Sequence, residues 1–430
     1  MPQTLRAPWV PFVIGALAFT TLVGALTGAL NLWSLHVLQE GVPVAHHQAH
    51  ALAQVFGFMW LLKVGISFHL APRLLGGRPP GRTVVSVVAV TGLAGVLLLV
   101  LGRLGGMLPG SGWLGLLGAV LLLLSMVTWA RFFWSLYRRR QELGDWLPEF
   151  VTAGATWWAV SAAALFVWQV GQTLGGPLLA VPFELVTWSG LLGGASSCIF
   201  GITLRAGACV MQVERSQASR QRVGFFVWQA ATALVLVKAL WPFAAWSDAL
   251  WLAPASALLV MVWVIRPFGG LRLNLTWDEP LVRFAMVASW GFAVVAAVLF
   301  GWRALAVVGL TPPPLLADAS RHAFTLGFAQ LGVFAFAGRM VPGFEGVRLP
   351  ARGLFDAGVL ALTAATALRL ASLFAPLRPA LVASGVSGPL ALVGVALLSW
   401  CLFKVLRGGA VLRRELEQSR ARIQVHVVRA

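Results

Sequence analysis

Histidine is the residue best suited to metal or cofactor chemistry here, and it is scarce, with seven in 430 residues. Three of them, His46, His47 and His50, open one long apolar run, and His322 opens another. Residues three or four apart share one face of a helix, so His47, His50 and Gln54 form a stripe that Gly57 continues. Because neutral imidazole is a strong ligand for transition metals, these two runs are the candidate site.

The composition places both runs in a membrane. With 59% hydrophobic residues, 11% charged residues and a mean hydropathy of +0.84, the chain is not a soluble globular protein. A membrane span needs about 20 mostly apolar residues, and twelve such runs can be found. They lie near residues 9–32, 49–71, 83–102, 112–136, 151–172, 184–210, 223–245, 249–265, 282–309, 321–341, 354–376 and 384–405. We therefore predict an all-α polytopic protein with a twelve-helix membrane domain over residues 1–406 and a basic cytoplasmic tail over residues 407–430.

Arginine sets the expected orientation, because Lys and Arg are retained on the cytoplasmic side. The loops after spans two, four, six, eight and ten are basic, while the intervening loops carry Glu40, Asp248 and Asp318. Arg103 and Arg378 are the exceptions. This alternation predicts that both termini are cytoplasmic.

The net charge of +18 is spread over these loops and is not gathered on one face. It therefore predicts contact with anionic lipid headgroups and argues against nucleic-acid binding.

Two other residue types have simpler expected roles. Cys198, Cys209 and Cys401 all fall within predicted spans without metal-ligand spacing, so we expect them to be packing residues. Lys63 lies in the inner half of span two, and we expect its ammonium to reach the cytoplasmic surface. A proton or ion path is the alternative for Lys63.

The orientation puts His47 and His50 at the outer end of span two and His322 at the outer end of span ten. One histidine from each of two facing helices can clamp a haem, with His47 as the alternative to His50 on span two. Gly57, seven residues after His50, would leave room beside a flat macrocycle. Zinc or copper is less favoured, because no Cys or carboxylate stands at ligand spacing. The alternative, weighed equally, is that these histidines simply occupy the wet interfacial zone.

Three arginines within spans, Arg303, Arg321 and Arg369, lie at the level of the histidines. Arginine pairs bidentately with carboxylates such as haem propionates. Arg321 directly precedes His322 and is the preferred clamp, whereas extension of each arginine to the outer surface is the alternative.

The motifs around the histidines resemble a known family. The stretch from His47-Gln-Ala-His50 through Gln54-Val-Phe-Gly57-Phe58, and the stretch Arg321-His322-Ala-Phe-Thr-Leu-Gly327-Phe328, look like the signatures of the NnrS family. That resemblance implies a multi-pass protein of the bacterial inner membrane that binds haem, with copper also claimed, and is linked to nitric-oxide metabolism. The layout is also similar to the haem–copper oxidase main subunit. By that analogy His50 and His322 are the axial ligands of a b-type haem.

The chain departs from both patterns. NnrS proteins carry His-Glu-Met in the first motif, where this chain has His50-Ala-Leu. An oxidase needs copper-binding histidines on helices six and seven, and those predicted spans contain none. A binuclear-centre reductase is therefore not expected, and whether the chain is an enzyme stays open.

Three classes of function remain after these arguments. The first is a haem protein of nitric-oxide metabolism or respiratory electron transfer, with a small gas and a redox partner as its expected ligands. The second is a twelve-span transporter, suggested by span count and buried charge. The third is a structural or anchoring subunit of a respiratory complex.

The topology can be tested with reporter fusions after Arg140 and after Ser419. Both should report the cytoplasm, because one follows an even-numbered span and the other lies in the tail. A periplasmic signal from either fusion would refute the twelve-span orientation.

Overall fold

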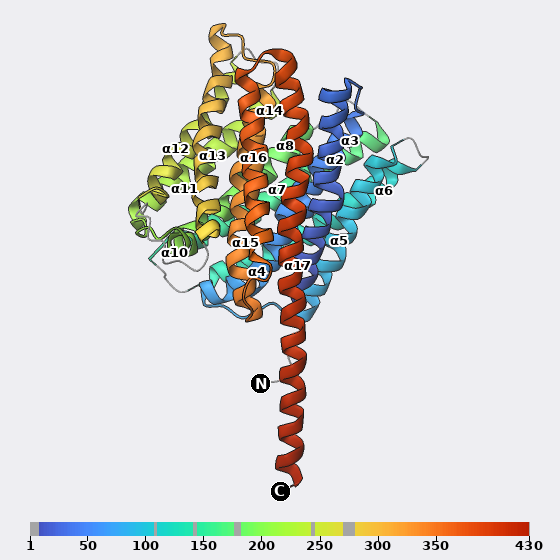
Figure 1. Ribbon diagram of the computed structural model, residues 1–430, viewed down its shortest axis with the longest axis vertical. Coiled ribbons are helices and arrows are strands. Elements are labelled where there is room, and N and C mark those ends of the chain that lie inside the picture. The colour runs from blue at the N-terminus through green and yellow to red at the C-terminus, as the bar shows by residue number, and fades with distance from the viewer. Residues whose placement is uncertain are drawn as a thin grey trace.

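The computed structural model describes residues 8–106, 110–140, 144–175, 182–241, 246–269 and 280–429. Within these ranges every regular element is helical, and twelve helical segments are long and apolar enough to cross a membrane (Figure 1). The predicted all-α fold with twelve spans is thereby confirmed. Spanning segments are helical because the bilayer offers no partner for a free backbone N–H or C=O.

Nine spans pack side by side around the outside of the bundle. Span one consists of α1 (Val10–Ala18), η1 (Phe19–Ala25), α2 (Leu26–Trp33) and η2 (Ser34–Leu38). The others are α5 (Arg82–Leu104), α6 (Ser111–Arg138), α7 (Leu147–Leu174), α11 (Ala218–Leu240), η7 with α12 (Ser247–Trp251, Leu252–Ile265), α13 with η8 (Pro280–Ala304, Leu305–Val308), α16 with η10 (Arg352–Ala371, Ser372–Phe374) and α17 (Leu377–Arg429).

Spans two, six and ten form the centre of the bundle. In their most apolar stretch 78% of the residues are buried, against 33–50% in the other nine spans. Span two is α3 (Val44–Leu52), η3 (Ala53–Trp60) and α4 (Leu61–Leu75). Span six is α8 (Phe183–Trp188), η5 (Ser189–Ser196), α9 (Ser197–Ile202), η6 (Thr203–Gly207) and α10 (Ala208–Met211). Span ten is α14 (Leu316–His322), η9 (Ala323–Gln330) and α15 (Leu331–Glu345).

Each central span contains a π-helical segment of eight residues: η3, η5 and η9. Glycine occupies the fifth position of all three, as Gly57, Gly193 and Gly327. π-Helical turns are rare and are found mostly at functional sites, so their occurrence at matching places in three helices is informative.

Each of these glycines receives an aromatic side chain from the preceding span. A Cβ at Gly57 would lie 2.7 Å from Cβ of Phe19, and one at Gly327 would lie 2.6 Å from Cγ of Phe292. Trp157 takes the same place against Gly193. Spans one, five and nine thus pack against spans two, six and ten in the same way.

The central spans also end alike. Counted from the last residue of its π segment, each helix reaches a left-handed residue sixteen positions later: Gly76 (φ 70°), Gln212 (φ 58°) and Gly346 (φ 68°). The following N–H closes the helix onto a carbonyl five residues back, as Gly77 does with Pro72 and Val213 with Ala208. Spans two, six and ten therefore share the same π segment, glycine packing and helix end, and the bundle is a four-span unit repeated three times.

Span twelve belongs to the longest helix of the chain. α17 continues from the bundle to Arg429 and projects beyond the other spans (Figure 1). The expected boundary between membrane domain and tail, at residue 406, lies within this helix.

The glycine–aromatic packing predicts a specific stability difference. Gly193→Ala should lower stability by about 1–3 kcal/mol, because its Cβ would overlap Trp157 in a packed core. Gly291→Ala in α13 is the control, since a Cβ there meets nothing within 4 Å and alanine is favoured over glycine in helices. Thermal unfolding of the purified variants measures both, and equal midpoints would refute the proposed constraint.

Candidate functional site

His50 lies three residues before η3 and is held against span one. Its Nδ1 is 2.6 Å from the carbonyl oxygen of Gly24, which belongs to the π segment η1. A carbonyl only accepts hydrogen bonds, so Nδ1 carries the proton and Nε2 keeps its lone pair. The ring lies on Gly28, where a Cβ would come within 2.5 Å of the imidazole. Span one therefore fixes both the tautomer and the position of His50.

His322 is the last residue of α14 and is oriented in the same manner. Its Nδ1 lies 2.9 Å from the carbonyl oxygen of Asp318 and 3.1 Å from Oδ1 of the same residue. Both atoms are acceptors, so here too Nδ1 donates and Nε2 is left with a lone pair.

The two imidazoles are close enough to interact electrostatically. Within the described ranges, neither Nε2 has a hydrogen-bond partner. Metal-binding histidines typically donate one ring N–H to a carbonyl or carboxylate and offer the other nitrogen to the metal. The two histidines selected from sequence therefore come together, and each is prepared as a nitrogen ligand.

Asp318 is the charged centre of this layer, and the sequence did not single it out. Its Oδ2 lies 3.3 Å from Nε of Arg369, whose side chain is only 3% exposed. His36 and His47 also interact electrostatically with Asp318. Asp318 thus neutralises a buried arginine and orients His322 with the same carboxylate.

The remaining polar candidates of spans two and ten take different positions. His47 and Arg321 are both exposed and influence one another electrostatically. His36 lies in the last turn of span one, in η2.

Arg303 is directed away from the histidines. Its guanidinium stacks 3.9 Å from the centre of the Trp251 ring and donates to the hydroxyl of Ser320 at 3.4 Å. Ser320 and His322 are two residues apart and so lie on opposite faces of their helix. Of the three arginines proposed as carboxylate clamps, Arg303 and Arg369 are therefore engaged elsewhere.

Gly57 and Gln54 also differ from expectation. The space that Gly57 leaves is filled by Phe19, so it provides helix packing and not room for a macrocycle. Gln54 accepts a hydrogen bond from the Thr20 hydroxyl at 3.0 Å, and that hydroxyl accepts one from Gln330 at 3.2 Å. This buried chain ties spans one, two and ten together beneath the histidines.

The opposite ends of the same helices form a separate cluster. The His69 ring packs 4.3 Å from that of Phe344 and 6.2 Å from that of Trp9, at the start of span one. Arg73 approaches its Nε2. His69 follows His50 by nineteen residues along span two and has no part in the layer of His50 and His322.

No group of three or more His, Cys, Asp or Glu side chains suited to hold a metal ion occurs in the described parts of the chain. What this part of the structure offers is two imidazoles, His50 and His322, each with Nδ1 bound to an oxygen acceptor.

The chain matches no family model and no curated protein. Its fold is similar to a chain of a heme-copper terminal oxidase dimer solved by cryo-EM, with a TM-score of 0.73 and 12% sequence identity. The match covers 94% of this chain and 84% of that chain. At this identity the match establishes the fold, and the expected resemblance to the haem–copper oxidase subunit is confirmed at that level.

The Asp318–Arg369 pair predicts an asymmetric mutational response. Asp318→Asn should destabilise the protein by about 3–5 kcal/mol, because it leaves the Arg369 charge buried without a counter-charge. Arg369→Met should cost less, since the Asp318 carboxylate keeps the ring N–H of His322 as a partner at 3.1 Å. Thermal unfolding of the two variants and of the double variant measures this, and the double variant should be more stable than Asp318→Asn. Equal losses from the two single variants would contradict the assignment.

Proposed function

We propose that this chain is a membrane haem protein of respiratory type that holds a b-type haem near its outer face between His50 and His322. The observation that carries the proposal is the pairing of these imidazoles on neighbouring central helices. Each has its Nδ1 bound to an oxygen acceptor, and neither Nε2 has a partner in the described parts of the chain.

The donor set fits the group. Two neutral imidazole nitrogens from facing helices are the usual axial pair of a low-spin haem. When bound, a haem supplies one-electron chemistry, and it binds small gases where one axial position is open. Asp318 and the Gly24 carbonyl orient the rings of His322 and His50, so that Nε2 of each ring is the nitrogen available to iron.

Among the arginines, Arg321 is the residue we assign to a propionate. It is exposed at the outer end of span ten, beside His322, and no hydrogen bond or ion pair engages its side chain in the described structure. His47 is likewise exposed one turn from His50, so it is the alternative ligand on span two. Gln54 is held by Thr20 and takes no part.

The motif resemblance to the NnrS family, together with the oxidase-like fold, supports a role in nitric-oxide metabolism or respiratory electron transfer in the bacterial inner membrane. Copper is not part of the proposal, because no group of three or more ligating side chains suited to a metal ion occurs in the described ranges. Anionic lipids, a redox partner and a small gas are the expected contacts.

Absorbance spectroscopy of protein purified after haem-replete expression tests the proposal. The wild type should show a Soret band of a low-spin haem. His50→Ala and His322→Ala should each lose the haem or turn it high-spin, because each removes one axial nitrogen.

His69→Ala is the matched control, since it removes a histidine from the inner end of span two and should leave the spectrum unchanged. Absence of a Soret band from the wild type would refute the haem proposal and favour a transporter or structural subunit. Nitric oxide added to the reduced protein then separates the roles: an unchanged spectrum indicates electron transfer, and a changed one indicates gas binding.

A further inference from the structure

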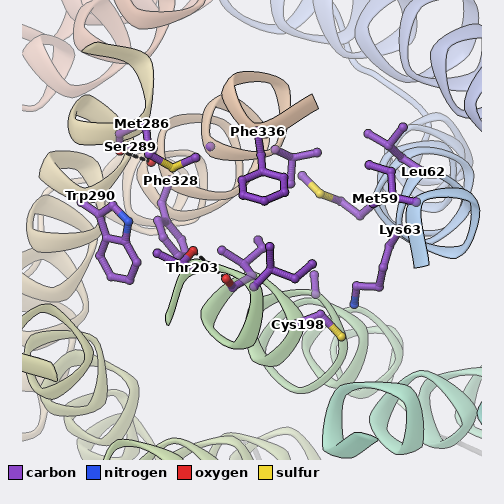
Figure 2. A pocket seen from close by; sticks show the side chains of 16 residues that line it. Met59, Leu62, Lys63, Cys198, Thr203, Met286, Ser289, Trp290, Phe328 and Phe336 are labelled. Atoms are coloured by element: carbon purple, nitrogen blue, oxygen red, sulfur yellow. Dashed lines mark hydrogen bonds between the residues drawn. The ribbon is translucent and has the colours of Figure 1, made fainter. Parts of the chain in front are cut away.

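The three central spans enclose a cavity of about 70 Å³, together with part of span nine (Figure 2). It lies just beyond the π segments, on the side away from the outer histidines. Its lining is almost entirely apolar, with Phe328 and Phe336 from span ten and Met59 from span two around it. Lys63 supplies the charge of this lining, whereas the hydroxyls of Thr203 and Ser289 donate to carbonyl oxygens of their own helices.

Lys63 breaks the threefold pattern of the lining. Counted from the last residue of each π segment, the third position is Lys63 in span two, Ile199 in span six and Val333 in span ten, and all three line the cavity. Six residues after each π segment come Ile66, Ile202 and Phe336, which are all apolar. The equivalent positions of spans six and ten carry aliphatic side chains, so Lys63 places a cation at a position that is apolar in the other two repeats.

The sequence predicts that the ammonium of Lys63 reaches the cytoplasmic surface, and the structure shows a different position. Nζ instead donates to the carbonyl oxygen of Gly194 at 2.6 Å and lies 5.0 Å from the centre of the Trp158 ring. Gly194 is in η5, so the side chain turns toward the middle of the membrane. The Cys198 thiol lies beside it (Figure 2).

Lys63 has no carboxylate partner within the described ranges. Other cations of the bundle do: Arg205 pairs with Asp145, Lys238 with Asp248 and Arg369 with Asp318. An ammonium has three N–H donors, and one carbonyl satisfies a single donor. A charge inside a membrane is costly unless it is neutralised, so the site calls for a negative partner that the neighbouring side chains do not supply.

We propose that this cavity binds a small, weakly hydrated monovalent anion against Lys63. A single negative charge neutralises the ammonium. One water needs roughly 10–15 Å³ of such cavity volume, so the cavity holds a few water-sized groups, which suits a small anion and not a macrocycle. The apolar lining selects an anion that loses little hydration energy on entry.

The anion site is independent of the proposed haem. Lys63 follows His50 by thirteen residues, which is about 20 Å along the helix at 1.5 Å per residue. Loss of one site therefore need not remove the other.

Thiocyanate is a suitable probe, because its infrared stretch reports a change from water to an apolar site. The full-length protein in detergent, with sulfate as the only other anion, should give a saturable bound band at one thiocyanate per chain. Lys63→Met should weaken binding at least tenfold, and Lys63→Arg should retain it because the charge remains. Thr203→Val, an isosteric change in the same lining, is the matched control and should bind as the wild type does.

Two further measurements establish that Lys63→Met folds and that the anion is not bound to haem iron. Thiocyanate should raise the unfolding temperature of the wild type and leave that of Lys63→Met unchanged, and a cooperative transition in the variant shows that it folds. The His50→Ala/His322→Ala double variant should keep the bound band. Absence of a bound band, or its persistence in Lys63→Met, would overturn the anion site. Loss of the band only from the double variant would also overturn it, because the anion would then be bound to haem iron. A missing Soret band would count against the haem alone.

Discussion

Phe19, Trp157 and Phe292 each fill the space that a glycine leaves on a central helix. In a bilayer no hydrophobic effect drives helices together, so close approach through small residues supplies much of the packing energy. These three contacts set how deeply spans one, five and nine press against spans two, six and ten. They also set the position of the π segments along the helices, and therefore the positions of the two polar sites that flank these segments. The histidines lie on one side of the π segments and Lys63 lies on the other.

The close packing of these spans also brings their polar groups within hydrogen-bond distance. Span one is close enough to span two for Gly24 to reach His50 and for Thr20 to reach Gln54. Thr20 also reaches Gln330 of span ten, so one buried hydroxyl ties together the two helices that carry the paired imidazoles. A hydrogen-bonded chain in a low-dielectric interior is stabilising only when its members are satisfied, and this one fixes the relative height of spans two and ten.

The sequence was sufficient for the twelve spans, because the bilayer imposes one length and one polarity on every crossing. Scarce histidines at matching helix ends also stand out in an apolar chain, which is why His50 and His322 are the candidate ligands. Asp318 escaped notice because an acidic residue at a helix start is indistinguishable from a loop charge until Arg369, 51 residues on, packs against it. Gly57 does not leave the room expected beside a macrocycle, because the sequence alone does not reveal which side chain of another span packs against a glycine. The π segments leave no periodic signature that hydropathy could detect.

The repeated architecture has a consequence for the order of folding. Most close helix pairs join consecutive spans, so they can form as each hairpin leaves the ribosome and inserts. The outer ring closes only when span twelve packs on span one, where Ser399 accepts a hydrogen bond from Thr21 across 378 residues of sequence. Gly385 and Gly388 of α17 make that closure against Val37 and Ala29. Span one also holds the carbonyl that orients His50. The histidine site draws on spans one, two, ten and eleven, so it can form only after span eleven has been inserted.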